Sequence, residues 1–133
     1  MTIGLLIITH NHIGDDLVAT ATAMLGLCPL ATEVLSVTQN ADPETTLRKA
    51  RQSVAALDQG NGVLVLTDIY GSTPSNIACH LIDSGRVQVI AGVNLPMLIR
   101  ILNYPQLGLA ELVDKAISGG KDGVLYCNPV CAG

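Results

Sequence analysis

The sequence predicts an α/β fold: a single domain built on a doubly wound, mostly parallel sheet with strand order 2-1-3-4. Three observations support this prediction. Uncharged, branched runs alternate with helical patterns along the chain. Two of these runs, Ile3–Ile8 and Gly62–Thr67, suit strands that are buried on both faces, as in parallel sheets. The length of 133 residues is enough for one domain with a proper core.

The first half of the chain predicts two strands, each followed by a helix. Asp15 and Asp16 suit the first turn of a helix, because acidic side chains stabilise the positive end of the helix dipole. Asp42 followed by Pro43 is typical of an N-cap and first helical position. The predicted elements are a strand over 3–8, a helix through about Leu25 that Gly26 and Pro29 end, a strand over 33–38, and a helix with Leu47, Ala50, Val54 and Leu57 on one face.

The second half repeats this alternation. Thr73-Pro74 again predicts a helix cap followed by proline, and Gly85 predicts the end of that helix. Gly119-Gly120 predicts the end of the last helix. The predicted elements are a strand over 62–67, a helix from Thr73 to about Ser84, a strand over 87–91, a short helix opened by Pro96, a helix over 109–118, and a short last strand over Val124–Tyr126.

The composition restricts the classes of function. The chain is 49% hydrophobic, but no apolar run approaches the ~18 residues of a membrane span. A net charge of -4, with seven scattered Lys and Arg residues, argues against nucleic-acid binding. No secretory pattern opens the sequence, so we expect a cytoplasmic protein. The four cysteines, Cys28, Cys79, Cys127 and Cys131, show no zinc spacing and are expected to be free thiols.

The predicted topology brings two polar residues together at one edge of the sheet. His10 follows the first strand and Asp68 follows the third, and these strands are neighbours in the order 2-1-3-4. A carboxylate at Asp68 can accept the Nδ1 proton of His10 and leave Nε2 as a nucleophile. Taken singly, each is better explained as a polar residue at a strand end or turn. Their convergence favours a functional site.

The loop beside this pair predicts an anion site. Gly71, Ser72 and Thr73 lead into the start of the third helix, where unpaired backbone N–H groups and two hydroxyls can bind a tetrahedral anion. Thr73 taken alone would be read as a plain helix cap. An activated histidine beside such a loop suits a phosphohistidine site better than a hydrolase site, so the sequence favours phosphoryl transfer.

Three segments together resemble a known family. They are Thr9-His10 after an apolar strand, the run Leu66-Thr67-Asp68-x-x-Gly71-x-Thr73-Pro74-x-Asn76, and the run Val89–Leu98. The pattern covers about residues 2–125 and resembles the mannose-family IIA component of the bacterial phosphoenolpyruvate:sugar phosphotransferase system. The resemblance implies a domain over 1–126, with a tail over 127–133.

The resemblance also implies roles and partners. His10 would be the phosphorylated residue, Asp68 the carboxylate that orients it, and Thr73 a hydroxyl near the phosphoryl group. The donor would be the histidine-containing phosphocarrier protein and the acceptor a IIB component, with no cofactor and no metal. The resemblance further implies a homodimer that pairs, or exchanges, the short C-terminal strand over 124–126.

The sequence departs from the family pattern and leaves alternatives open. The family often has Gly directly after the histidine, whereas Asn11 and His12 follow His10 here. A regulatory protein that signals through its phosphorylation state remains an alternative to a transport component. A metal-binding module would use His10 and His12 with Asp15 or Asp68. A nucleotide binder lacks its glycine-rich signature here, and a non-catalytic interaction domain is the default for a small α/β chain.

Overall fold

The computed structural model describes residues 2–128 and contains a four-stranded sheet in the order β2-β1-β3-β4, with every neighbouring pair parallel. The predicted doubly wound topology is therefore confirmed. The elements are β1 (Gly4–His10), α1 (Ile13–Leu25), β2 (Thr32–Val37), α2 (Pro43–Leu57), β3 (Val63–Thr67), α3 (Thr73–Cys79), β4 (Val87–Ala91), α4 (Leu95–Leu102) and α5 (Leu109–Asp122).

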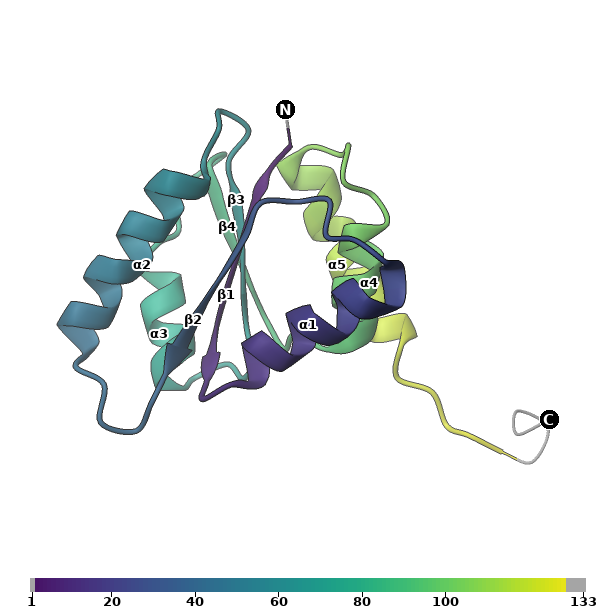
Figure 1. Ribbon diagram of the computed structural model, residues 1–133, viewed down its shortest axis with the longest axis horizontal. Helices are drawn as coiled ribbons and strands as arrows, with labels where there is room; N and C mark the ends of the chain where they lie inside the picture. Colours follow the sequence, from purple (N-terminus) through teal and green to yellow (C-terminus); the bar gives the residue numbers. More distant parts are fainter. Residues whose placement is uncertain (1, 129–133) are drawn as a thin grey trace.

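Helices cover both faces of the sheet. α2 and α3 lie on one face, while α1, α4 and α5 lie on the other (Figure 1). Side chains alternate along the two central strands, so Leu6 and Ile8 pack toward α2 and α3, and Leu5 and Ile7 pack toward the other layer. Every residue of β3 and all but His10 of β1 are buried. The prediction that the runs 3–8 and 62–67 form strands buried on both faces is therefore confirmed.

The start of α2 and the end of α1 follow the predicted capping chemistry. The side chain of Asp42 accepts a hydrogen bond of 3.0 Å from the backbone N–H of Thr45, and Pro43 opens α2. The Asn94 side chain caps α4 in the same way, accepting from Met97 N at 2.9 Å. α1 ends at Gly26, which has a φ of 82° as a left-handed cap requires. These local signals fix where the loops at the site begin and end.

The last helix corrects the sequence prediction. Gly119 and Gly120 do not end α5, which continues to Asp122. A Cβ on Gly119 would lie 2.5 Å from Cβ of Arg100, and one on Gly120 would lie 2.9 Å from Cε of Met97. The two glycines therefore allow α4 and α5 to approach closely, and this packing outweighs their low helix propensity.

Two other predicted elements differ from the structure. α3 ends at Cys79 instead of about Ser84, and the chain then turns through Gly85, which has a φ of 78°. His80 Nδ1 lies 2.7 Å from the carbonyl oxygen of Asn76 at this end of the helix. The segment 124–126 forms no strand in the single chain; its side chains are exposed and it extends away from the domain (Figure 1). A lone strand without a partner has no ladder to stabilise it.

The predicted tail at 127–133 lies mostly outside the described residues, since 129–133 are not described, and the expected thiol of Cys131 falls there. Cys28, Cys79 and Cys127 are free thiols, as predicted. Among residues 2–128, every helix is too short or too polar to traverse a lipid bilayer.

Candidate functional site

The ends of β1 and β3 bring His10 and Asp68 into direct contact. Ile8 pairs with Thr67 across the two strands, so the next residues of each strand meet at the carboxyl edge of the sheet. Asp68 Oδ2 lies 2.8 Å from Nδ1 of His10 and also accepts a hydrogen bond of 3.0 Å from the His10 backbone N–H. The predicted pair is therefore present, although 58 positions separate its members.

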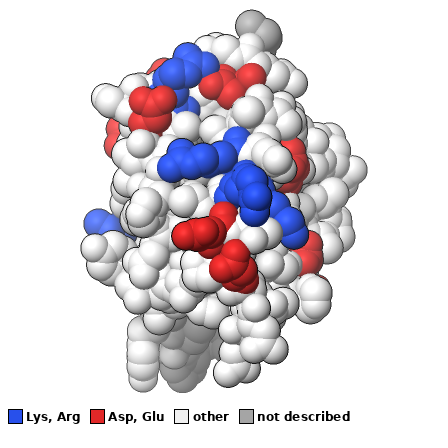
Figure 2. Space-filling view, turned by 90° about the vertical axis from the view of Figure 1, so that its left-hand side faces the viewer, with Lys and Arg blue, Asp and Glu red and all other residues white. Residues whose placement is uncertain are grey.

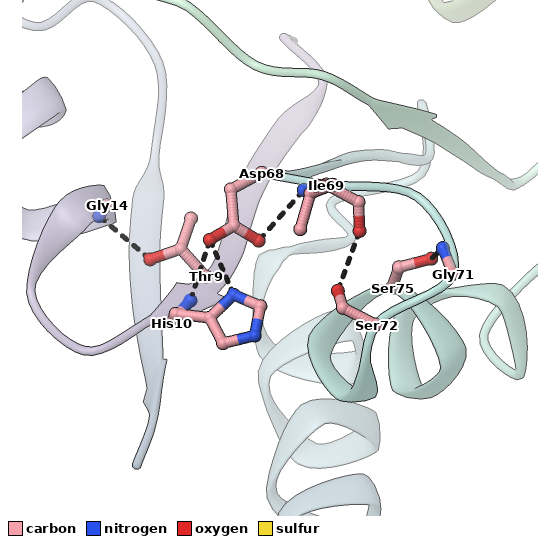
Figure 3. Close-up of polar contacts among 8 residues, drawn as sticks. All are labelled: Thr9, His10, Gly14, Asp68, Ile69, Gly71, Ser72 and Ser75. Carbon is pink, nitrogen blue, oxygen red and sulfur yellow. Dashed lines mark hydrogen bonds and ion pairs between the residues drawn. The ribbon is translucent and has the colours of Figure 1, made fainter. Parts of the chain in front are cut away.

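Both carboxylate oxygens of Asp68 accept hydrogen bonds. Oδ2 is used by His10, and Oδ1 accepts from the backbone N–H of Ile69 at 3.0 Å (Figure 3). Burial raises the pKa of Asp68, but the hydrogen bonds and charge of His10 outweigh it and leave that pKa below its usual 3.8. Asp68 is therefore ionised at neutral pH and is the acceptor for a hydrogen bond from the Nδ1–H group of His10.

The histidine ring has its second nitrogen free for chemistry. Since Nδ1 faces Asp68, Nε2 lies on the other side of the ring, toward α3 (Figure 3). The His10 side chain is 41% exposed, whereas that of Asp68 is 12% exposed. His10 lies on the rim of an open cavity of about 550 Å³, which Thr73 and Pro74 also line. A ring held by a half-buried carboxylate and open to solvent at Nε2 is suited to act as a nucleophile.

The turn after β1 sets the direction of the ring. Thr9 points to the opposite face from His10, where its buried hydroxyl accepts a hydrogen bond of 2.8 Å from Gly14 N at the start of α1. Asn11 has a φ of 48°, in the left-handed region that Gly and Asn tolerate best. Asn11 thus meets the backbone requirement at a position where the family often has glycine.

The predicted anion loop is partly committed to its own hydrogen bonds. The Ser72 hydroxyl donates to the carbonyl of Ile69 at 2.6 Å, and Gly71 N donates to the Ser75 hydroxyl at 3.1 Å (Figure 3). The N-cap is Ser72, one residue before the predicted Thr73, and it makes no side-chain cap bond. Of the three predicted residues, Thr73 lines the cavity beside His10, while Gly71 and Ser72 shape the turn.

Sequence reasoning missed several residues of this edge. Buried Ser75 holds the turn, and its position after Thr-Pro is the only signal that could have found it. Thr38 and Gln39, from the loop after β2, also line the cavity. Nothing in their local sequence marks them, because only the pairing of His10 with Val37 places this loop beside His10.

The second histidine belongs to a separate contact. His12 Nδ1 lies 3.2 Å from Asp15 Oδ2, and the same oxygen accepts from the Ser36 hydroxyl at 3.0 Å. His10 and His12 thus pair with different carboxylates. Within residues 2–128, no three His, Cys, Asp or Glu side chains are grouped closely enough to hold a metal ion.

Comparison with solved structures assigns the fold to a class of phosphotransferase-system proteins. The structure is similar to the mannose/sorbose-specific IIA subunit of the phosphotransferase system from Enterococcus faecalis, with a TM-score of 0.84, 25% identity and 96% of each chain covered. It has the same fold as the EIIA component from Streptococcus agalactiae, with a TM-score of 0.82, 22% identity, and 93% of this chain and 96% of the other covered.

The sequence then defines the family. Residues 4–117 match EIIA-man, the PTS system fructose IIA component, and the chain belongs to this family. It is 36% identical over 135 residues to the mannose-specific EIIAB component of Escherichia coli K12, covering 98% of this chain but only 42% of that protein. It is 37% identical over 87 residues to the fructose-specific EIIA component of Bacillus subtilis, covering 64% of this chain and 60% of the relative. The predicted family is therefore confirmed, and the chain spans less than half the length of its mannose-specific EIIAB relative.

Proposed function

We propose that the chain is a phosphocarrier: His10 accepts a phosphoryl group from the histidine-containing phosphocarrier protein and passes it to a IIB component for sugar uptake. The observation that supports this most directly is the contact of 2.8 Å between His10 Nδ1 and Asp68 Oδ2. It fixes the ring while the Nε2 side faces an open cavity. We expect both steps to take place in the cytoplasm.

The geometry suits an exchange between two histidines. The lone pair of His10 Nε2 attacks the phosphorus of the donor phosphohistidine, so the new N–P bond forms as the donor N–P bond breaks. The ring of His10 gains positive charge in this step. The carboxylate of Asp68 stabilises that charge through the Nδ1 proton, without having to move. Because the bonds broken and formed are of the same kind, the exchange requires little driving force.

The phosphoryl group itself would be held lightly. Thr73 lines the cavity and would donate a hydrogen bond to a phosphoryl oxygen, with N–H groups at the start of α3 beside it. Gly71 and Ser72 support that turn. No Lys or Arg occurs in 9–16 or 67–76. On the face formed by α2 and α3, the Lys and Arg side chains lie in the upper and middle parts of the view (Figure 2). They are away from the lower end of the molecule, where the strands end (Figure 1). A carrier without an arginine clamp can hand its group on readily.

We also propose that the chain works as a homodimer over the domain 1–126. Val124 and Leu125 are each 77% exposed and Tyr126 is 90% exposed, although all three are strongly β-forming or apolar. The outer edge of β4 is not paired with another strand in the described chain. Pairing this segment with a partner's sheet would bury the apolar side chains and satisfy a backbone edge.

Phosphoenolpyruvate and the two general proteins of the phosphotransferase system provide the test. Incubation of the chain with phosphoenolpyruvate and these two proteins should add one acid-labile phosphoryl group per chain, seen by intact-mass measurement. The group should be absent in His10→Ala and present in His12→Ala, which is the matched control. A chain that remains unmodified, or a label that survives in His10→Ala, would contradict the proposed function.

A further inference from the structure

Two large apolar side chains stand exposed directly beside the His10–Asp68 pair. Ile69 is 60% exposed and Tyr70 is 80% exposed, and both follow Asp68 in the chain. Adjacent exposed residues of this size are typical of protein-interaction sites, and tyrosine is enriched among the residues that dominate binding energy. Their position next to the nucleophile connects this surface to what happens at His10.

Hydrogen bonds hold the backbone that presents them. Ile69 N donates to Asp68 Oδ1, and the Ile69 carbonyl accepts from the Ser72 hydroxyl at 2.6 Å. Gly71 N then donates to the buried Ser75 hydroxyl at 3.1 Å. The turn of residues 68–72 is thus held at both ends, partly by the same carboxylate that orients His10 (Figure 3). A surface that is already ordered loses little conformational entropy when a partner covers it.

The charges around this edge define the partner's chemistry. Asp15 and Asp16 at the start of α1, and Asp42 and Glu44 at the start of α2, are exposed, and both helices start at the carboxyl edge of the sheet. The loops 9–16 and 67–76 contain no Lys or Arg. A complementary partner therefore has an apolar centre within a basic rim.

We propose that Ile69 and Tyr70 form the docking anchor for a protein that carries a phosphoryl group on an exposed histidine. This inference rests on the proposed function, because direct transfer requires the reacting atoms to come within about 3–3.5 Å of each other. A donor that approaches Nε2 this closely must cover the surface immediately around His10. Tyr70 fills an apolar recess of that donor, and the acidic first turns of α1 and α2 face its basic rim.

Phosphoryl transfer kinetics separate docking from chemistry. The donor is the purified, phosphorylated histidine-containing phosphocarrier protein, and phosphoramidate serves as a small donor that needs no docking. Tyr70→Ala should raise the KM for the protein donor about 10-fold or more and leave the rate with phosphoramidate unchanged. Tyr70→Phe should keep most of the affinity. Tyr70→Asp should weaken docking as Tyr70→Ala does, which provides a second soluble variant of an exposed position.

Ile82→Ala is the matched control, because Ile82 is 55% exposed but lies in the turn before β4, at the opposite end of the sheet. It should change neither rate. An unchanged KM in both Tyr70→Ala and Ile69→Ala would overturn the proposal, as would an equal loss with phosphoramidate, which would place Tyr70 in the chemistry. If the wild-type chain accepts nothing from the protein donor but reacts with phosphoramidate, the proposed function itself fails and the docking anchor fails with it.

Discussion

Replacing Asp68 by Asn tests how the carboxylate serves His10. The two oxygens of Asp68 accept three N–H groups: the backbone and Nδ1 of His10, and the backbone of Ile69. Asparagine offers one oxygen and one NH2 group in the same shape. Whichever way the amide is turned, either His10 or Ile69 then faces a donor instead of an acceptor.

The size of the effect follows from the lost contact. A hydrogen bond to a charged group contributes about 1.5–3 kcal/mol. In Asp68→Asn this hydrogen-bond energy is lost at the point of the reaction where the His10 ring becomes positive. Transfer to His10 should therefore slow about 10- to 150-fold, since ~1.4 kcal/mol corresponds to a factor of ten. Rapid-quench measurement with phosphorylated donor protein gives the rate. The fraction of His10 protonated at Nδ1, measured by ¹⁵N NMR, should fall in parallel.

The exposed pair of His12 and Asp15 is the control for this experiment. Its nitrogen and oxygen are 3.2 Å apart and its side chains are 80% and 50% exposed. With phosphoramidate, the donor that needs no docking, Asp15→Asn should leave the transfer rate within about twofold, because exposed pairs contribute little. Wild-type transfer in Asp68→Asn, or an equal loss with phosphoramidate in Asp15→Asn, would refute the reasoning.

The depressed pKa of Asp68 adds a dependence of stability on pH. Its pKa is below 3.8 in the folded chain, so the unfolded chain binds its proton first as the pH falls. The stabilisation is therefore present above the unfolded value and is lost as the pH falls through the folded value. Wild-type and Asp68→Asn should converge in unfolding free energy in this acid range. A gap that does not narrow there in urea titrations would argue against the shift.

Four further changes have definite expected outcomes. The Thr67 hydroxyl is buried without a hydrogen-bond partner among the described residues, so Thr67→Val should raise the unfolding free energy by about 1 kcal/mol in urea titrations. Gly119→Ala should lower it by about 1–3 kcal/mol through the contact with Arg100, whereas Gly108→Ala, with open space around the added Cβ, should change it less. Deleting 124–133 leaves α5 whole and should give monomers in sedimentation velocity; an unchanged dimer would place the interface elsewhere. Transfer from purified phosphorylated donor should continue under a chelator, and a loss restored by Mg²⁺ or Zn²⁺ would implicate a metal.

Local sequence signals determined most of the helices and strands, and topology determined the contact of His10 with Asp68 at the site. Three features could be predicted because each depends on neighbours a few residues away. They are the branched runs of β1 and β3, the helix cap at Asp42 and the end of α1 at Gly26. The pairing of His10 with Asp68 was also predictable, since parallel strand order places the ends of β1 and β3 side by side.

Tertiary packing decided the rest. Gly119 and Gly120 have the sequence pattern of a helix end, yet they lie inside α5 because the neighbouring α4 needs the space that a Cβ would fill. Likewise, Thr38 and Gln39 join the cavity of His10 only through the register of β1 with β2. The sequence by itself determined the four strands of the sheet, the caps at Asp42 and Gly26 and the contact of His10 with Asp68, whose causes are local or topological. Only the folded chain decided which side chains surround that pair, because such contacts arise between segments far apart in sequence and depend on how closely the layers pack.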